Sequence, residues 1–319
     1  MTGRTKFRMI PLTLFLLLSL LLGCLSGCGA TVTPAETGGG SLRESETEAQ
    51  TSPIAELESR ASGVMYYADF FRVGKADAIL LRSGSSAGMI DAGETDDAAY
   101  LVSELSRLGV TRLDFLILTH FDNDHIGAVP RILDALTVDE ILAPDYARDS
   151  ELYRTVLASA ESHGVSVTRL SEDRTVAFGT SALKVWTSAT EAETDPDTGC
   201  LVRDEDDNAF SLICEWTCGS VRMLFLADAE KDRLTELMET RTLTVYGLIK
   251  LPHHGSYSKP LQKLLNRTVP KAAVSCVDNL TAMDGQLTDL LSDMGVRSFL
   301  TCDGTVRAAT DGSELAVEQ

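Results

Sequence analysis

A dense group of polar side chains follows an apolar run near residue 118. Residues 118–127 read LTHFDNDHIG and place two histidines, two aspartates and one asparagine in six consecutive positions. The preceding run, residues 113–118, is apolar except for Asp114 and predicts a buried strand. Imidazoles and carboxylates gathered at a strand end predict a metal site, because together they suit zinc, manganese or iron. The alternative is a polar helix cap, in which Asp124 caps a helix that begins near Ile126, but a cap requires no histidines.

The spacing of these residues suggests more than one ion. His120, Asp122 and Asp124 occupy alternate positions, and the next residue is His125. Loops at strand ends can bring side chains together at one point. In an irregular loop, this spacing lets two pairs of ligands face two neighbouring ion positions.

Two later apolar runs also end in potential ligands. LFLAD ends in Asp228, whose carboxylate could bridge two metal ions. The alternative role for Asp228 is an N-cap for a helix that starts at Ala229. The run LIKLPHHGS leads into His253 and His254. Four of the five histidines therefore follow predicted strands, whereas His163 precedes a glycine at a helix end and is expected at the surface.

The rest of the pattern indicates strands in groups, with helices between and after them. Helical spacing is found at 96–109, 127–137, 150–164, 229–240 and 285–295, and an acidic loop spans about 190–207. A strand is expected at 208–217, and a short hairpin over Gly304 near the end. This grouping predicts an α/β fold of two sheets packed face to face with helices outside. A doubly wound sheet would need more regular alternation, and no glycine-rich phosphate loop follows the first strand.

The first 28 residues have the pattern of a lipoprotein signal peptide. A basic segment at 4–8 precedes an apolar stretch at 9–22. LSGC at 25–28 resembles a bacterial lipobox, which makes Cys28 the lipidated first residue of the mature protein. LGC at 22–24 is a weaker competing site, and a plain N-terminal membrane anchor is the alternative. In each case we expect a membrane-anchored domain outside the cytoplasm, at the bacterial cell surface or on the periplasmic side.

Composition sets broader limits. The chain has 319 residues, 44% of them hydrophobic, and a formal net charge of −19, which disfavours a broad non-specific nucleic-acid surface. Residues 29–62 are rich in Thr, Glu, Ser and Gly and predict a disordered linker, so the folded domain is expected at 63–319. Five cysteines follow the predicted signal peptide. Of these, Cys214 and Cys218 either bridge a hairpin turn or serve as small buried apolar residues.

The motifs THFDNDHIGAVP, FLADAE and LIKLPHHGS, in this order and spacing, resemble the metallo-β-lactamase fold, an αββα four-layer sandwich. They are more similar to its ComEC-like branch. This is the hydrolase domain attached to bacterial DNA-uptake channels, together with its free-standing relatives. In that branch the usual HxHxDH signature becomes HxDxDH, as Asp122 makes it here. The likeness spans about residues 65–310 and includes FFRVGKADAILL and MIDAG near its start.

The resemblance implies a role for each matching residue. The implied metal ligands are His120, Asp122, Asp124, His125, Asp228, and one of His253 and His254, with the other beside the site. The first two would hold one ion and the next two the second, while Asp228 would bridge both. Asp124, Asp228 and His254 would act directly in catalysis. Asp77, Asp91 and Asn208 would support the ligands from behind.

The chain departs from the branch at two places. Arg72, Lys75 and Ala76 replace the usual Asp, Gln and Gly of the opening motif. A Gly-His-Pro is common after the late strand, but here SCVDNLTAMDGQLTD contains Gln286 and no histidine. The predicted metal ligands are intact, so a functional site is expected. If the missing histidine takes part in catalysis or phosphate binding in the branch, the activity or substrate differs here.

The implied chemistry is hydrolysis with two divalent ions, Zn²⁺ or Mn²⁺. Two such ions about 3.5–4 Å apart lower the pKa of a bridging water and clamp the oxygens of the reacting group. Asp122 in place of a histidine hardens the ligand set, which makes Mn²⁺ a competitor of Zn²⁺. We expect a phosphodiesterase or nuclease that acts on a short or single-stranded nucleic-acid or other phosphodiester fragment. The alternatives are hydrolysis of a carbon ester, lactone or lactam, and a non-catalytic binding module with a residual metal site.

Overall fold

The structure is a computed structural model that describes residues 51–319. Two large β-sheets run through these residues. The predicted signal peptide and Cys28 lie outside the described residues. The first sheet has the order β17-β16-β1-β2-β3-β5-β7-β8. Its strands are β1 (Tyr66–Phe70), β2 (Ile79–Ser83), β3 (Ser86–Ile90), β5 (Phe115–Ile117), β7 (Glu140–Pro144), β8 (Ser166–Leu170), β16 (Val306–Thr310) and β17 (Leu315–Glu318). The strands from β3 to β8 pair in parallel, and the others pair antiparallel.

The second sheet has the order β15-β14-β13-β12-β11-β10-β9. Its strands are β9 (Arg174–Phe178), β10 (Ser181–Trp186), β11 (Ile213–Cys218), β12 (Val221–Phe225), β13 (Leu248–Lys250), β14 (Ala272–Ser275) and β15 (Arg297–Leu300). The strands from β12 to β15 pair in parallel. A small separate sheet joins β4 (Arg112–Leu113) to β6 (Thr137–Val138). Each large sheet therefore has a parallel part whose strands all end at the same edge.

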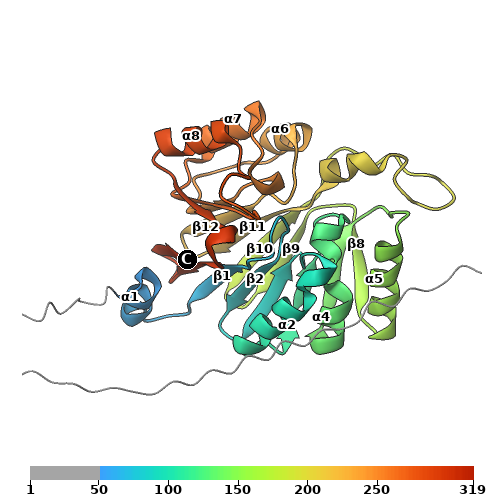
Figure 1. Cartoon of the computed structure of the whole chain (residues 1–319), viewed down its shortest axis with the longest axis horizontal. Coiled ribbons are helices and arrows are strands. Elements are labelled where there is room, and N and C mark those ends of the chain that lie inside the picture. The colour runs from blue at the N-terminus through green and yellow to red at the C-terminus, as the bar shows by residue number, and fades with distance from the viewer. Residues whose placement is uncertain (1–50) are drawn as a thin grey trace, which may run out of the picture. The chain divides into compact units, whose positions relative to one another are not determined.

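Helices cover the outer face of each sheet. The α-helices are α1 (Pro53–Arg60), α2 (Ala98–Arg107), α3 (Asn123–Ile126), α4 (Val129–Ala135), α5 (Glu151–Ser162), α6 (Lys231–Thr240), α7 (Lys259–Thr268) and α8 (Gly285–Asp293). Short 3₁₀ helices lie at η1 (Thr95–Asp97), η2 (Asp204–Phe210), η3 (His253–Gly255) and η4 (Thr301–Asp303). In Figure 1, α2, α4 and α5 lie together in green on one side, and α6, α7 and α8 lie together in orange and red on the other.

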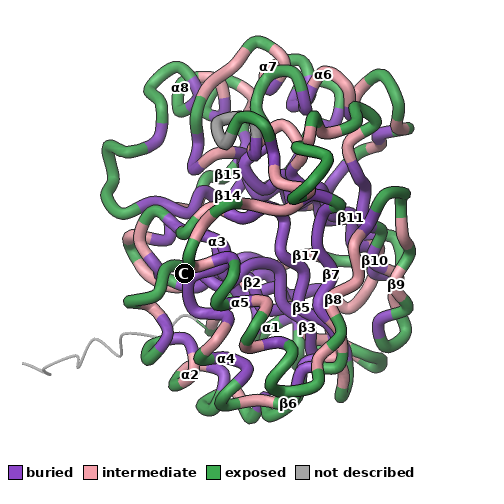
Figure 2. Tube along the Cα trace, turned by 90° about the vertical axis from the view of Figure 1, so that its right-hand side faces the viewer, coloured by how far each residue is buried: buried purple, intermediate pink, exposed green. Residues whose placement is uncertain are grey.

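Three hydrophobic clusters hold the layers together. The central cluster lies between the sheets and includes Phe115 of the first sheet and Trp216 of the second. The two outer clusters lie between each sheet and its helices. Alternation along β2 shows how one strand serves two clusters, because Ile79 and Leu81 join the central cluster and Leu80 joins an outer one. Figure 2 shows the buried strands at the centre and the exposed turns outside. The predicted αββα four-layer sandwich is confirmed.

Several local predictions differ from the structure. Helix α1 lies inside the segment predicted as a disordered linker, and it packs through Ile54 and Leu57, which are buried. The Ile54 amide donates to Glu318 of β17 at 3.3 Å, so the folded part begins before residue 63. The predicted strand at 208–217 begins only at Ile213, because the residues before it form η2.

Three further features were missed or misplaced. Helix α7 was not predicted, although Ser258 caps it and Pro260 lies in its first turn. The strands on either side of Gly304, β15 and β16, belong to different sheets, and the terminal hairpin is formed by β16 and β17. Cys214 and Cys218 are free and buried within one strand, β11, so of the two alternatives the small buried apolar role is confirmed and the bridge is wrong. Among residues 51–319, no helix is both long and apolar enough to cross a membrane.

Candidate metal centre

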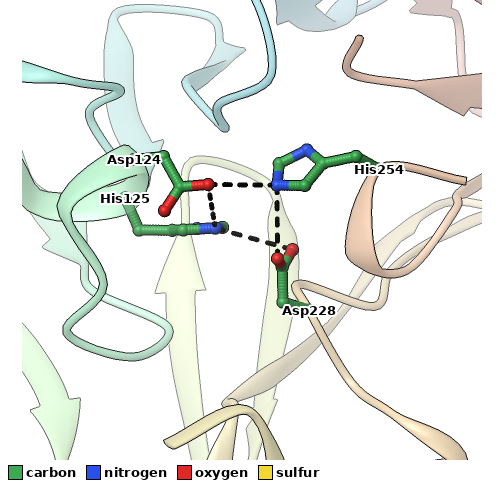
Figure 3. A group of neighbouring side chains, drawn as sticks. All are labelled: Asp124, His125, Asp228 and His254. Carbon is green, nitrogen blue, oxygen red and sulfur yellow. Dashed lines mark ion pairs between the residues drawn. The ribbon is translucent and has the colours of Figure 1, made fainter. Parts of the chain in front are cut away.

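Four predicted ligands converge at the carboxyl ends of the parallel strands. Asp124 and His125 lie in α3, which follows β5 of the first sheet. Asp228 follows β12, and His254 lies in η3 after β13, both in the second sheet. One ligand atom from each of the four lies within 4.8 Å of the others. Each sheet therefore contributes half of this group, which we call the quartet (Figure 3).

The distances within the quartet are those of groups that face a common point. The His254 Nε2 atom lies 3.2 Å from Oδ2 of Asp124 and 3.2 Å from Oδ2 of Asp228. The His125 Nε2 atom lies 3.5 Å from Oδ1 of Asp228 and 3.9 Å from Oδ2 of Asp124. Both histidines are buried, and Asp228 is 3% exposed. Two imidazoles and two carboxylates thus surround a small volume that is largely closed to solvent.

The buried ring nitrogens of this region support a divalent ion. Within residues 51–319, the Nε2 atoms of His120, His125 and His254 are buried and have no hydrogen-bond partner. A buried polar atom without a partner is costly, and a metal ion satisfies an imidazole nitrogen directly. The ligand types, imidazole and carboxylate, suit Zn²⁺ or Mn²⁺. The residues of the quartet therefore fit one divalent ion.

The pKa values of the metal-free quartet also support a divalent ion at this point. Burial lowers the pKa of His254, but its contacts with Asp124 and Asp228 outweigh that effect and raise the pKa to about 9. Burial also opposes a charge on His125, whereas Asp228 and Asp91 raise its pKa well above the ordinary value. Burial raises the pKa of Asp124, but His254 and His125 lower it to about 2. The carboxylates thus favour protonated imidazoles in the metal-free quartet, and a divalent ion would take the place of those protons.

The helix-cap alternatives do not hold. Asp124 lies inside α3, and the residue at the N-cap of that helix, Asp122, makes no capping hydrogen bond. Helix α6 begins at Lys231 with Glu230 at its N-cap, so Asp228 does not cap it. Both carboxylates are instead directed toward the histidines of the quartet.

His120 and Asp122 lie beside the quartet. The rings of His120 and His125 are 4.0 Å apart between centroids, and His120 Nε2 lies 3.7 Å from Oδ2 of Asp122. On its other side, Asp122 Oδ1 accepts a hydrogen bond from Arg148 at 3.2 Å. Among the described residues, His120 and Asp122 do not join a third acidic or histidine side chain in a group as close as the quartet. His120 and Asp122, the two ligands predicted for a second ion, therefore lie together beside the quartet, and Asp122 also bonds a guanidinium.

Asp207 belongs to this neighbourhood and was not predicted. Its buried carboxylate accepts hydrogen bonds from Tyr146, Arg148 and the Phe121 amide, the last at 3.2 Å. The predicted supporting residue, Asn208, follows it in η2, and its Oδ1 atom is buried. The only sequence signal for Asp207 was its position next to Asn208 in the run DDNAF.

His253 lies apart from the quartet. Its Nδ1 atom is 3.3 Å from Oε1 of Glu230, and its side chain is 30% exposed. Both residues line a pocket of about 320 Å³ between the starts of α6 and α7, together with Lys231 and Tyr257. Of the two adjacent histidines, the structure places His254 with the ligands and His253 at the wall of this pocket.

Asp91 supports two of the histidines from behind. Its carboxylate lies 2.8 Å from His125 Nδ1 and accepts hydrogen bonds from the amide and hydroxyl of Thr119 at 2.8 and 2.7 Å. The Thr119 hydroxyl lies 3.0 Å from His120 Nδ1. His254 Nδ1 lies 2.9 Å from the carbonyl oxygen of Cys276. These contacts turn each Nε2 atom toward the centre.

Asp77 and Lys250 form a buried ion pair behind the quartet. Lys250 is fully buried, donates to Asp77 and lies 3.6 Å from Oδ1 of Asp228. Burial lowers the pKa of Lys250, but the two carboxylates outweigh it and hold the pKa above its ordinary value. Asp77 was predicted as a supporting residue, whereas Lys250 was not. A lysine inside the apolar run LIKL was the available signal.

The backbone around the centre is strained and tightly connected. Outside glycine, positive φ values within residues 51–319 occur at Asp91, Ala227, His253, His254 and Val269. His254 belongs to the quartet, and Asp91, Ala227 and His253 lie beside it, where strain is typical of functional sites. Gly127, at the end of the first ligand loop, has no room for a side chain, because a Cβ would lie 2.3 Å from the Thr95 nitrogen.

Comparisons with known proteins agree with this geometry. The family model described as Metallo-beta-lactamase superfamily matches residues 72–277, which is more than half of the chain. The chain is 26% identical over 174 residues to ComE operon protein 3 of Bacillus subtilis (strain 168), which covers 54% of this chain and 21% of the relative. It is 27% identical over 173 residues to Recombination protein 2 of Haemophilus influenzae, which covers 53% of this chain and 18% of the relative.

The match to these curated relatives thus spans about a fifth of their length. Among solved structures, the metallo-β-lactamase fold protein YhfI from Bacillus subtilis matches with a TM-score of 0.48 and 12% identity, covering 75% of this chain and 96% of that one. The two curated relatives support the ComEC-like branch that the motifs resemble.

Proposed function

The chain belongs to the metallo-β-lactamase superfamily, and from this membership and its quartet we propose that it hydrolyses phosphodiester bonds with divalent metal ions. The observation that carries the proposal is the convergence of Asp124, His125, Asp228 and His254 from both sheets on one buried point. The family match and this cluster together support a metal-dependent hydrolase. The phosphodiester as substrate is the further part of the proposal.

The quartet would hold one ion, and His120 with Asp122 would hold the second. The bound ions would supply Lewis acidity and an activated water. Zn²⁺ and Mn²⁺ both suit these ligands. Asp228 lies between the histidines and would orient the attacking water through its carboxylate. Asp91 and the Cys276 carbonyl fix the ring orientations of His125 and His254, so that the geometry does not have to form during the reaction.

Two features support a phosphodiester over a carbon ester or a lactam. Asp122 stands where the wider superfamily has a histidine, and carboxylate ligands favour the hard ions that commonly act on phosphate oxygens. The name of one relative, Recombination protein 2, concerns nucleic acid. The net charge of −19 opposes long duplex DNA, so the proposed substrate is a short or single-stranded fragment.

The place of action is part of the same proposal. The basic and apolar start of the chain and the LSGC lipobox support lipidation at Cys28 and an extracytoplasmic domain on a membrane tether. Labelling of cells with a fatty-acid analogue would test this. Label is expected on the wild-type chain and not on Cys28→Ser, and label on both would contradict lipidation at Cys28.

A panel of substrates tests the proposed reaction. The full chain would be stripped of metal, reloaded with Mn²⁺ or Zn²⁺, and given a phosphodiester, a phosphomonoester, a carboxyl ester, a lactone and a lactam. Bis-p-nitrophenyl phosphate and labelled single-stranded DNA would serve as the phosphodiesters. The proposal predicts metal-dependent turnover of the phosphodiesters above all others. Turnover confined to esters, lactones or lactams would contradict the phosphodiester substrate. It would still agree with a metal-dependent hydrolase.

A further inference from the structure

The two halves of the quartet are carried by different sheets, so something must set the distance between them. Asp124 and His125 follow a strand of the first sheet, while Asp228 and His254 follow strands of the second. Apolar packing between sheets is not directional, so it does not by itself align individual ligand side chains. Ligands of a metal ion, in contrast, must be placed to within a few tenths of an ångström of their ideal distances.

A buried ion pair crosses between the sheets directly behind the quartet. Lys250 is the last residue of β13 in the second sheet, and Asp77 lies in the loop between β1 and β2 of the first. Lys250 has no exposed surface, and Asp77 is 1% exposed. The Lys250 ammonium donates to the Asp77 carboxylate. A buried charge is tolerated only when it is paired, so these two residues strongly favour this contact.

On the side of the second sheet, Lys250 holds the turn that presents Asp228. It donates to the Ala227 carbonyl oxygen at 3.0 Å and lies 3.6 Å from Oδ1 of Asp228. The ammonium group thus donates hydrogen bonds to Asp77 and to the Ala227 carbonyl, and it lies at ion-pair distance from Asp228. Ala227 has a φ of +48°, a left-handed conformation that is unfavourable for alanine. The same carbonyl accepts the His253 amide at 3.1 Å, which ties the turn to the loop that carries His254.

On the side of the first sheet, Asp77 is bonded to the loop that carries the other ligands. Its backbone amide donates to the Asp124 carbonyl oxygen at 3.1 Å. Its own carbonyl accepts from the Gly93 amide at 2.7 Å, and the Gly93 carbonyl in turn accepts from the Gly127 amide at 2.8 Å. The carboxylate also lies 3.8 Å from Nδ1 of His254. Asp77 is therefore in contact with both halves of the quartet.

We propose that the Lys250–Asp77 ion pair is the joint that sets the two halves of the quartet at ligating distance. In this role Lys250 and Asp77 are positioning residues, which act through Asp228, His254 and the Asp124 loop. The inference rests on the metal centre of the proposed function. It goes beyond that function because it concerns how the centre is assembled across the two sheets. Loss of the pair is expected to weaken metal binding more than it weakens the fold.

The test compares metal affinity with stability in the full chain. Lys250→Met keeps the bulk of the side chain and removes its charge, but it leaves Asp77 unpaired. The double variant Lys250→Met/Asp77→Asn removes both charges, and a buried pair replaced in this way usually leaves the fold intact. Asp69→Asn is the matched control, because Asp69 is also fully buried and paired. Its partners are Arg82 and Arg307, and the three residues lie on β1, β2 and β16 rather than at the quartet.

The dissociation constant for Mn²⁺ and Zn²⁺ would be measured by competition with a chelator, and folding by thermal denaturation. The absorption spectrum of the Co²⁺-loaded chain would report the ligand geometry. In the double variant, the dissociation constant is expected to rise about 10- to 100-fold, with an altered Co²⁺ spectrum. Asp69→Asn is expected to lower the melting temperature and leave both metal readouts unchanged.

The outcomes separate this inference from the proposed function. A double variant that folds and binds metal as the wild type does would show that the Lys250–Asp77 pair does not position the quartet. If the double variant does not fold, Asp77→Asn alone decides by the same readouts. If the wild-type chain itself binds no divalent ion, the proposed function is wrong, and so is the positioning role of the ion pair.

Discussion

The Nδ1 atom of His125 lies 2.8 Å from Oδ2 of Asp91, and both side chains are fully buried. The contact fixes which ring nitrogen carries the proton, since Nδ1–H must face the carboxylate. It leaves Nε2 directed at Asp228, without a hydrogen-bond partner in the described chain. The orientation of one ligand is thus determined by a residue 34 positions earlier in the sequence, at the end of β3.

Removal of the Asp91 charge is expected to weaken metal binding. In Asp91→Asn the amide keeps its size but no longer favours the proton on Nδ1 of His125. Loss of such a supporting partner typically raises the dissociation constant about 10- to 100-fold. Chelator competition would measure it, with Asp139→Asn as control because that carboxylate pairs with Arg112 at the surface. Equal affinities of Asp91→Asn and the wild type would show that the contact does not support the ligand.

Metal affinity is expected to rise with pH. A divalent ion can use Nε2 of His254 only when that nitrogen is deprotonated, and the pKa of His254 in the metal-free chain is raised to about 9. Binding below that pH must displace the His254 proton, and the raised pKa of His125 adds to the effect, so the apparent affinity should increase at least about tenfold per pH unit from 6.5 to 8.5. Competition experiments, corrected for the chelator's own protonation, would show the slope. A flat profile would mean that the imidazole is already neutral.

The stability of the metal-free chain is expected to fall as the pH rises, whereas the metal affinity rises. The folded-state pKa of His254 lies above that of a free histidine, so its contribution is complete below about pH 6.5. That contribution is lost as the pH rises through about 9. The melting temperature of the metal-free chain should therefore fall across this range, while the metal-loaded chain changes little. A parallel fall in both forms would point to another titrating group.

The adjacent histidines are expected to differ in function. Asparagine tolerates the left-handed backbone found at both positions, so His253→Asn and His254→Asn remove the imidazoles with little added strain. His254→Asn should raise the dissociation constant for metal more than about 100-fold, beyond the effect of a supporting residue. His253→Asn should keep its metal and raise KM, because His253 lines the pocket beside the centre. Metal analysis and steady-state kinetics on both variants would distinguish them, and metal loss in His253→Asn would contradict this assignment.

The two ion positions are expected to bind unequally. Asp122 shares its carboxylate with Arg148, so an ion beside His120 must compete with the guanidinium. Arg148→Met removes that competitor, and the weaker of two binding steps should tighten about fivefold, the effect of losing a partly exposed ion pair. Calorimetric titration with Mn²⁺ would resolve the steps. Tightening of the stronger step instead would place Arg148 at the quartet.

Most of the fold and the four residues of the quartet could be predicted because they depend on local patterns. Apolar runs that end in Asp124 and His125, in Asp228, and in His254 fixed both the strands and the chemistry at their ends. The parallel pairing that brings these ends together follows from the layered architecture. Sequence could also narrow the fourth ligand to two adjacent histidines, but only the turn geometry of η3 separates them.

The features that were missed depend on contacts between distant segments. Lys250 reads as one charge in an apolar strand, and its partner Asp77 lies 173 positions earlier. Asp207 lies in an acidic loop where most carboxylates are exposed, and its burial follows from contacts with Tyr146 and Arg148. Asn208 was assigned to a strand because apolar residues follow it, whereas the chain forms a 3₁₀ turn first. No local pattern contains this information.

The central claim is that the quartet drives metal-dependent phosphodiester hydrolysis. The most direct measurement is the rate of bis-p-nitrophenyl phosphate hydrolysis as Mn²⁺ or Zn²⁺ is added to the metal-free chain. It would be made for the wild type, for Asp124→Asn, and for Asp134→Asn as a surface control. Turnover is expected to rise with bound metal in the wild type and the control and to be lost in Asp124→Asn. Bound metal without turnover, or equal turnover in Asp124→Asn, would contradict it.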